Sequence, residues 1–507
     1  MPYVVAALIA LVALARGGYA AWGILALELG SVGLLLWVVG EVLYATSDEE
    51  RALLRAGRRS TSEVTIEGPG ESKASYRARS SRDYFVIAGF PFKKTHLGIP
   101  FGLLTVWILL SLLPLDAHWL ERLSPKALEL RSDASAPWTL SPFMTARSLW
   151  MFLACFGLVA VGAHLGSNPA RVRRLSLLLF GLGVGFGLHG MAQWLFGLQD
   201  LFGRDPSMSA LRASGSFGNR NHYAAFMCML FLCGLGWLAT KRIELTGRTA
   251  LAGRSLRRFE ESGGQLFLLG LGAVVSGVGL VFSLSRSGIT FALLGTAVWV
   301  ALVSTRRSPD EGRGRFRSWT SALTLSLATL AIAAWVGLDP VVHRFKLLSD
   351  EWETEQGRSL VWKDSLTALP DFAVTGSGLS TYRYVFPIYR SFGGNLAYSW
   401  AHNDYIQLLI ELGVPGFLLL LWVMAIVGLW SARVRKSLGA QSRSGHLHAG
   451  YVAAIVAIAF HSFTDFPLHL AANAALLSVI VGVAVGAEPP LRRSRRSTER
   501  AGEVASD

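Results

Sequence analysis

The sequence predicts an all-α, polytopic integral membrane protein of about twelve transmembrane helices, with one large, partly helical loop on the side away from the cytoplasm. Two observations predict this fold. Of the 507 residues, 52% are hydrophobic and only 16% are charged, whereas soluble proteins carry about 25% charged residues. The apolar residues also fall in long unbroken blocks, close to the roughly 20 residues that cross a hydrocarbon core. Because lipid offers the backbone no hydrogen-bond partners, such blocks must be helical.

Twelve segments meet this description. They lie near residues 2–15, 20–45, 98–115, 146–165, 175–197, 222–240, 265–284, 288–304, 319–338, 413–432, 449–467 and 470–487. The first is the shortest, because its 14 residues give only about 21 Å of helix. It also resembles a secretory signal peptide, but such peptides begin with positive charge and no Lys or Arg precedes this run. We therefore expect a short, retained span.

The formal charge of +14 does not indicate nucleic-acid binding, because the basic residues follow the membrane pattern. Of the 48 Lys and Arg residues, 33 lie in alternate loops, namely 51–96, 166–174, 241–263, 305–317, 433–448 and the C-terminal tail. This alternation is the positive-inside rule, which places both termini of a multi-pass protein in the cytoplasm. We expect an inner (cytoplasmic) membrane protein whose basic clusters face membrane lipids and not nucleic acid.

Two long loops divide the chain. The predicted parts are transmembrane helices 1–2 in residues 1–46, a basic cytoplasmic loop in 47–96, helices 3–9 in 97–338, a periplasmic loop in 339–411, helices 10–12 in 412–487 and a basic cytoplasmic tail in 488–507. The first loop is rich in Ser, Arg and Gly, and we expect partial disorder with a short strand at Glu63–Glu67. The second is aromatic, with helix-like stretches near 357–369 and 402–411. We expect it to fold and to carry the catalytic function.

Unusual polar residues gather on the periplasmic side. The run from Arg212 to Tyr223, RASGSFGNRNHY, leads into the sixth span. Asn219 and Asn221 can cap the helix that follows, and a helix N-terminus favours anions. Capping alone leaves the two arginines of this run unexplained, so a simple capped loop and an anion site stand as equal alternatives.

A second candidate, Arg286, occupies a three-residue turn, Ser285–Ser287, between two apolar spans. Charges at such depth are costly and are often functional. The alternative is an arginine whose long side chain merely extends to the membrane surface. We favour the functional interpretation.

Two further runs contain histidine. AHNDYIQLLIELGVPG, from Ala401 to Gly416, places His402 beside the start of the tenth span. Histidine can take a proton from an attacking hydroxyl, although a single loop histidine is more often structural. HSFTDFPLH, from His461 to His469, joins the last two spans. Its Asp465 either pairs with an arginine or caps the twelfth helix, and the structural role is slightly favoured.

Two arginines, a histidine and helix N-termini at one membrane face suit transfer from a phosphate-bearing donor. The arginine fork binds phosphate oxygens in a bidentate fashion, and fixed positive charge stabilises a departing phosphate group. A histidine beside them can activate an acceptor hydroxyl. The acidic cluster from Asp350 to Glu355 is more simply a solvated charge run, so we expect neither a metal nor a cofactor.

At these residues the chain resembles the O-antigen ligase and O-antigen polymerase superfamily of bacterial membrane glycosyltransferases, over roughly residues 140–487. The final motif, His402-Asn403, nine residues, then Gly413 and Gly416, is the most specific and is associated with ligases. The other matching motifs are a G-x-F-x-N-x-N segment (Gly215, Phe217, Asn219, Asn221), the S-R-[GS] turn at Ser285–Ser287, Gly357-Arg358 with Trp362, and Pro370 with Gly376 and Gly378.

The resemblance implies a GT-C-like fold and an inverting, metal-independent glycosyltransferase of lipopolysaccharide or polysaccharide biosynthesis in the cell envelope. It implies a glycan donor on undecaprenyl pyrophosphate and, for a ligase, a lipid A core acceptor. Arg212 and Arg286 would hold the donor pyrophosphate, and His402 would act as the base or orient the acceptor. The substrate-binding candidates are Asn219, Asn221, Arg358, Asn403 and Asp404.

Three alternatives stay open, and one of them is a catalytically silent scaffold for an envelope assembly. A polymerase of the same superfamily would join the glycan to another lipid-linked unit. A membrane transporter, a different class of protein, would place polar groups near the membrane midplane, often on broken helices. The deep polar residues available for that role are few: Glu28, Glu41 and His189.

Overall fold

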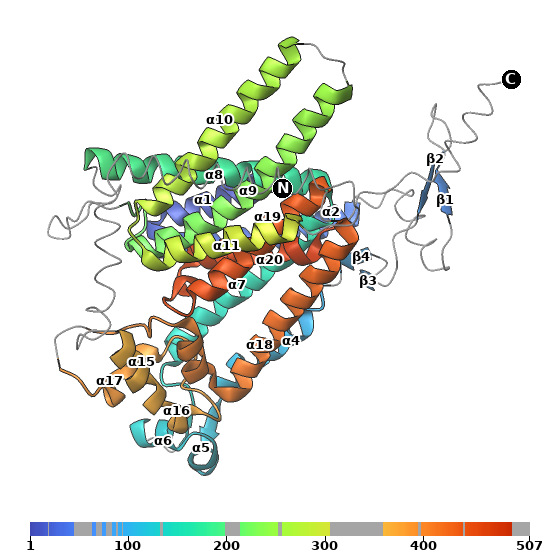
Figure 1. Cartoon of the computed structure of the whole chain (residues 1–507). Coiled ribbons are helices and arrows are strands. Elements are labelled where there is room, and N and C mark those ends of the chain that lie inside the picture. The colour runs from blue at the N-terminus through green and yellow to red at the C-terminus, as the bar shows by residue number, and fades with distance from the viewer. Residues whose placement is uncertain are drawn as a thin grey trace.

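The fold was taken from a computed structural model that describes residues 1–18, 20–44, 63–66, 74–77, 84–87, 90–93, 95–131, 135–197, 213–251, 256–304, 358–393, 397–439 and 442–488. A bundle of long helices carries a smaller helical unit at one end (Figure 1). Seven helices in these ranges are long and apolar enough to cross a membrane. The prediction of an all-α polytopic membrane protein is therefore confirmed.

The bundle helices follow the predicted spans. They are α1 (Pro2–Leu14), α2 (Ala21–Tyr44), α4 (Gly98–Ser111), α7 (Pro142–Gly166), α8 (Pro169–Phe196), α9 (Arg220–Leu251), α10 (Leu256–Val281), α11 (Arg286–Ser304), α18 (Asp404–Leu438), α19 (Arg443–His461) and α20 (Ala471–Gly486). The predicted ninth span, 319–338, lies outside the described residues. The short α1 packs against α2, α8 and α20, so it is part of the bundle core.

The smaller unit combines two separated parts of the chain (Figure 1). It contains α5 (Ala117–Leu123), α6 (Pro125–Arg131), α15 (Arg358–Thr367), α16 (Leu369–Phe372) and α17 (Tyr382–Tyr389), with β5 (Pro114–Asp116) paired antiparallel to β6 (Ser135–Pro137). The helix-like stretch predicted near 357–369 corresponds to α15 and α16. Short 3-10 turns, η1 (Arg16–Gly18) and η5 (Pro467–His469), precede α2 and α20.

Four short strands lie between α2 and α4. Antiparallel pairs form between β1 (Glu63–Ile66) and β2 (Ala74–Arg77), and between β3 (Tyr84–Ile87) and β4 (Phe90–Lys93). The strand predicted at Glu63–Glu67 is thus confirmed as β1.

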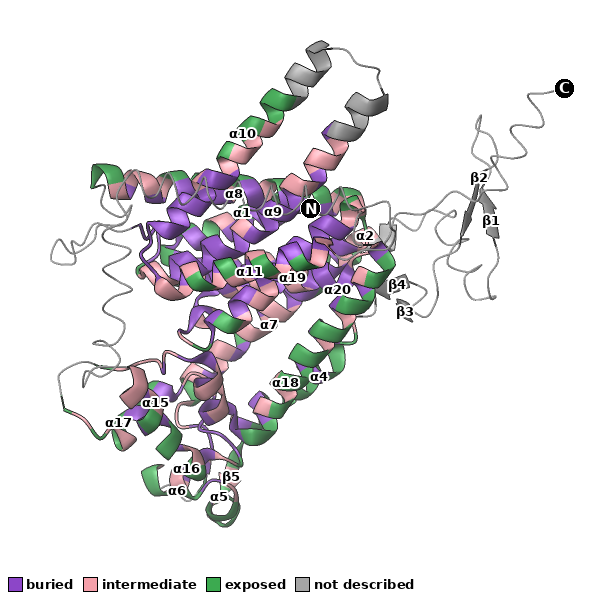
Figure 2. Ribbon diagram, viewed as in Figure 1, coloured by how far each residue is buried: buried purple, intermediate pink, exposed green. Residues whose placement is uncertain are grey.

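Burial identifies the centre of the bundle. Helix α9 packs against α8, α10, α11 and α19. Within its apolar 18-residue stretch, 83% of the residues are buried. Figure 2 shows that α4 and α18 instead carry many exposed residues along their length. Their exposed side chains include Leu103, Leu418 and Leu429, which suits contact with lipid.

Small residues bring α7 and α20 into close contact. A Cβ atom added to Gly162 would lie 2.6 Å from Val479 O, and one added to Gly482 would lie 2.2 Å from Val159 O. Only glycine allows this approach, which is the usual way that membrane helices gain packing contacts. The pairing fixes where the connection from α19 to α20 emerges.

Candidate active site

Helix α18 runs from Asp404 to Leu438 with a break at Gly413, where φ is 66°. The segment predicted as the end of the long loop and the span predicted to begin at 413 therefore form one broken helix. The break removes the intrahelical partners of the preceding carbonyl groups, and other donors replace them. These bonds are Ser377 N to Ile410 O at 3.0 Å, Gly378 N to Glu411 O at 2.9 Å and Trp107 Nε1 to Leu412 O at 2.8 Å.

The two glycine motifs of the sequence meet at this break. Gly376 has φ 75° and Gly413 has φ 66°. Residues other than glycine rarely adopt this left-handed backbone conformation. A Cβ atom on Gly376 would lie 2.3 Å from Glu411 O, and one on Gly413 would lie 2.7 Å from Gly376 N. The loop of the smaller unit is thereby fixed against the first turns of α18.

His402 lies just before α18 with its backbone in the left-handed region, φ 52°. Such residues cost free energy and persist only where their neighbours hold them. Asn403 is the helix N-cap, and its side chain accepts two backbone N–H groups of the first turn. Asp404 N donates to Ser462 O at 2.9 Å. Asn403 thus serves as a cap and is 6% exposed, so the substrate-binding role expected for it gains no support.

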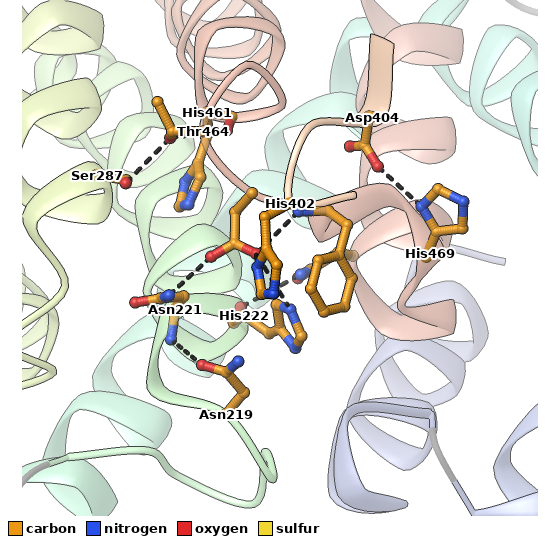
Figure 3. Close-up of polar contacts among 12 residues, drawn as sticks. Asn219, Asn221, His222, Ser287, His402, Asp404, His461, Thr464 and His469 are labelled. Atoms are coloured by element: carbon orange, nitrogen blue, oxygen red, sulfur yellow. Dashed lines mark hydrogen bonds and ion pairs between the residues drawn. The ribbon is translucent and has the colours of Figure 1, made fainter. Parts of the chain in front are cut away.

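The carboxylate of Asp465, in the connection between α19 and α20, is fully buried. Four polar side chains surround it, and Figure 3 shows three of them, Asn221, His222 and His402, close together. The distances are 2.7 Å from Asn221 Nδ2 and 3.4 Å from Arg358 Nη2 to Oδ2, and 3.5 Å from His402 Nδ1 and 3.8 Å from His222 Nε2 to Oδ1.

Asp465 remains ionised in this position. Burial alone would raise the pKa of Asp465. The neighbouring His402 and the charge of Arg358 lower the pKa by more than burial raises it, so it lies below the usual range. Of the two roles considered for Asp465, pairing with an arginine is the one that the geometry supports. Capping is excluded, because the N-cap of α20 is Leu470.

Arg358 begins α15 and joins the smaller unit to the bundle. Besides its contact with Asp465, its Nη1 donates to Thr464 O. The Arg358 side chain is 33% exposed. Arg358 and His402 contact the same carboxylate, so the two candidates share one site.

The helix N-termini of α9 and α11 adjoin the same connection. Asn219 caps α9, with its Oδ1 accepting Asn221 N at 2.8 Å, whereas the Asn221 side chain turns to Asp465. Thr464 Oγ1 donates to Ser287 Oγ at 3.0 Å (Figure 3). The expected capping by Asn219 is confirmed, and Asn221 has a different role.

Arg286 is the first residue of α11 and is half-buried. The turn between α10 and α11 covers 282–285, so the prediction that Arg286 lies in a three-residue turn was wrong: Ser285 caps the helix by accepting Gly288 N at 3.2 Å. A cation at N1 is unusual, because a helix N-terminus is itself positive. The Arg286 side chain and the N-terminus of α11 therefore both favour an anion at this point. Arg212 lies outside the described residues.

A second polar network lies behind Asp404. His469 Nδ1 is 2.8 Å from Asp404 Oδ1, Gln407 Nε2 lies 3.0 Å from both His469 Nε2 and Glu411 Oε1, and Glu411 accepts two backbone N–H groups around the start of α17. Burial lowers the pKa of His469, but the hydrogen bond and charge of Asp404 raise it more. Asp404 is 1% exposed, so it positions the loop before α18 and its expected substrate contact gains no support.

Sequence reasoning left the role of Asp465 open and did not single out two further buried members of the site, His222 and His461. Asp465, His222 and His461 are each at most 1% exposed, and neither ring nitrogen of His461 has a hydrogen-bond partner among the described residues. The signal was present in HSFTDFPLH, a short connection with two histidines and a carboxylate, and in the histidine that follows Asn221. The packing of α9 against α19, α20 and η5 brings these two runs together.

The arrangement suits proton transfer beside a phosphate group. With Nδ1 of His402 facing a buried carboxylate, Nε2 is left as the proton acceptor, the role an imidazole plays beside a carboxylate in hydrolases. Arg358 and the N-terminus of α11 supply positive charge nearby.

Residues 271–421 match the family described as O-antigen ligase. The matched segment contains Arg286, Arg358 and His402 and ends just after the break of α18. A comparison with curated proteins returned no match. The family match over this part of the chain supports the resemblance to the O-antigen ligase superfamily of polytopic membrane proteins.

Proposed function

We propose that this protein is a glycosyltransferase of the bacterial inner membrane that moves a glycan from undecaprenyl pyrophosphate to an acceptor hydroxyl at the periplasmic face. One observation carries the proposal: His402, Arg358 and Asn221, from three separate segments, converge on the buried carboxylate of Asp465. The family match supports ligase or polymerase activity in general terms.

The proposed reaction is a single displacement that inverts the anomeric carbon. His402 Nε2 takes the proton of the acceptor hydroxyl, and the hydroxyl oxygen attacks the anomeric carbon. The bond from that carbon to the pyrophosphate oxygen breaks, and undecaprenyl pyrophosphate leaves with the electron pair. Asp465 stabilises the imidazolium that forms. Arg286 and Arg212 bind the leaving pyrophosphate and stabilise its negative charge. The proposed reaction therefore uses no metal.

Ligase activity, with a lipid A core acceptor, is our leading proposal, because the motif from His402 to Gly416 is the ligase-associated one. The break at Gly413 gives that motif a physical role, since it fixes the loop that holds His402. A polymerase uses the same donor chemistry and differs only in the acceptor.

The transporter alternative loses one of its supports. Glu41 Oε2 lies 2.6 Å from Arg171 Nη1 and 3.1 Å from His164 Nε2. These residues stand at the end of α2, the beginning of α8 and the end of α7, so Glu41 belongs to an ion-pair cluster at helix termini and not at mid-membrane.

The deciding experiment incubates the purified full-length protein with a lipid-linked oligosaccharide and, in separate reactions, lipid A core or no added acceptor. Product on lipid A core supports the ligase, and chain growth on the lipid carrier supports the polymerase. Accumulation of a solute in vesicles, dependent on Glu28 or Glu41, with no glycan transfer would establish the transporter instead.

Variants test the mechanism. His402→Ala and Arg286→Ala are expected to abolish transfer, while membrane insertion and yield stay at the wild-type level. Arg122→Gln, on α5 and exposed, is the matched control and should transfer normally. Transfer retained by both His402→Ala and Arg286→Ala would refute the assigned roles.

A further inference from the structure

A shallow cavity of about 210 Å³ lies beside the candidate site in the smaller helical unit. Its walls are α17 and the short segment 397–399. The volume is below the roughly 300 Å³ of typical ligand pockets, so it suits a single sugar ring and not a long glycan. The cavity is open to the surface.

One stripe of α17 faces this cavity. The lining residues Arg383, Phe386, Pro387 and Arg390 follow the i, i+3, i+4, i+7 spacing that places residues on one face of a helix. The opposite wall contains Tyr398 and its two neighbours. Two guanidinium groups therefore flank an apolar floor.

The two arginines differ in how they are held. Arg390 stacks over the rings of Phe392, at 4.6 Å, and Tyr398, at 5.3 Å, and donates to Gly393 O at 2.7 Å. Arg383 is exposed and forms no hydrogen bond or ion pair within the described part of the chain. An arginine held by aromatic rings beside an exposed one is a suitable clamp for an anion, since guanidinium binds carboxylate and phosphate oxygens with two N–H groups.

Two carboxylates near this pair accept hydrogen bonds from neighbouring neutral groups. Asp364 accepts the backbone N–H and the hydroxyl of Ser391, at 2.7 and 2.9 Å. Asp371 accepts the hydroxyl of Tyr389. The cavity thus places two guanidinium groups beside aromatic rings, a combination that suits an anionic sugar with an apolar ring face.

The cavity is within reach of His402. Tyr398 precedes His402 by four residues, which even when fully extended span at most about 14 Å. The intervening chain is fixed, because Trp362 Nε1 donates to Ala401 O at 3.0 Å and Trp400 stacks on Phe466 at 5.1 Å. A sugar in the cavity and a hydroxyl at His402 can therefore belong to one short oligosaccharide.

We propose that this cavity is a subsite for an anionic sugar, one bearing a phosphate or carboxylate group, within the glycan that reacts at His402. The inference rests on the proposed glycosyltransferase function and adds to it the chemical class of the substrate. Arg383 and Arg390 bind the anionic group, and Tyr398 contacts the sugar ring.

The test measures binding of glucose 6-phosphate, glucose and glycerol 3-phosphate to the purified full-length protein in neutral detergent, by ligand-observed NMR. Glycerol 3-phosphate represents a lipid headgroup. We expect glucose 6-phosphate to bind at least about tenfold more tightly than the other two. Arg383→Gln should weaken it about tenfold, the worth of one charge-assisted hydrogen bond, whereas Arg383→Lys should retain part of the affinity. Arg122→Gln is the matched control and should bind as the wild type does.

Each outcome decides the matter. Equal binding of glucose refutes recognition of the charge, equal binding of glycerol 3-phosphate refutes recognition of the sugar, and wild-type affinity in Arg383→Gln refutes the site. His402→Ala should still bind glucose 6-phosphate, because binding does not require proton transfer. Binding without any glycan transfer by the wild type would refute the proposed function but not the subsite, and transfer without binding would refute the subsite alone.

Discussion

The substitution Asp465→Asn tests the centre of the proposed site with almost no change of shape. The amide oxygen can still accept Phe466 N, now at 2.9 Å from Oδ1. The amide nitrogen would replace Oδ2 and face the Asn221 amide, a donor against a donor. The negative charge opposite His402 is lost.

The size of the effect follows from the geometry. An imidazolium forming on His402 lies 3.5 Å from the carboxylate, which corresponds to about 5 kcal/mol at an effective dielectric constant of about 20. His402 is 30% exposed, and we take solvent screening to remove about half, leaving roughly 2–3 kcal/mol. At about 1.4 kcal/mol for each tenfold change, transfer should slow by roughly 30- to 160-fold.

The assay is the initial rate of glycan transfer by purified protein at saturating donor, with the apparent melting temperature measured in parallel. Asp371→Asn is the matched control, because that carboxylate contacts Tyr389 outside the site and its loss should leave the rate within about twofold of wild type. A folded Asp465→Asn protein with an unchanged rate would refute the role of the carboxylate. An equal loss in both variants would show that the effect is not specific to the site.

Two predictions concern stability and pH. Gly413→Ala should lower the free energy of unfolding by about 2–5 kcal/mol, because it combines a strained φ with a clash against Gly376. Gly428→Ala is the control in the same helix, because nothing lies within 4 Å of a Cβ atom added there. In thermal denaturation this variant should be neutral or slightly stabilising. The raised pKa of His469 beside Asp404 stabilises the fold fully below about pH 6.5, the unfolded value, and this contribution is lost as pH rises through the folded pKa. The melting temperature of the wild type should therefore fall more steeply above about pH 6.5 than that of His469→Gln, and parallel curves would contradict the assignment.

Hydropathy and charge were sufficient to predict most of the fold. Bundle helices lie at eleven of the twelve predicted positions, because the free energy of placing each residue in lipid depends on that residue and its near neighbours. Boundaries were less accurate. Arg286 falls inside α11 and Asp404 begins α18, since a cap and a helix break depend on backbone geometry that the apolar pattern does not report.

The site was predicted only in part. His402, Arg358 and Asn221 were named from local motifs and do share one carboxylate. Asp465 was named but its role was left open, because a single acidic residue in a short turn gives the same local signal whether it caps a helix or pairs with an arginine from more than a hundred positions earlier. The packing of α9, α15 and α19 decides between these, and that packing is not local in the sequence.

The break in α18 also separates two mechanical environments. Beyond Gly413 the helix carries outward-facing apolar residues such as Leu418 and Leu429, and we expect the tilt of this part to follow the thickness of the bilayer. Before Gly413 the same helix is hydrogen-bonded to the loop of the smaller unit through the carbonyl groups that lack a partner within the helix. Tilting of the lipid-facing part can be absorbed at the glycine. The histidine at the other end then keeps its place when the membrane changes.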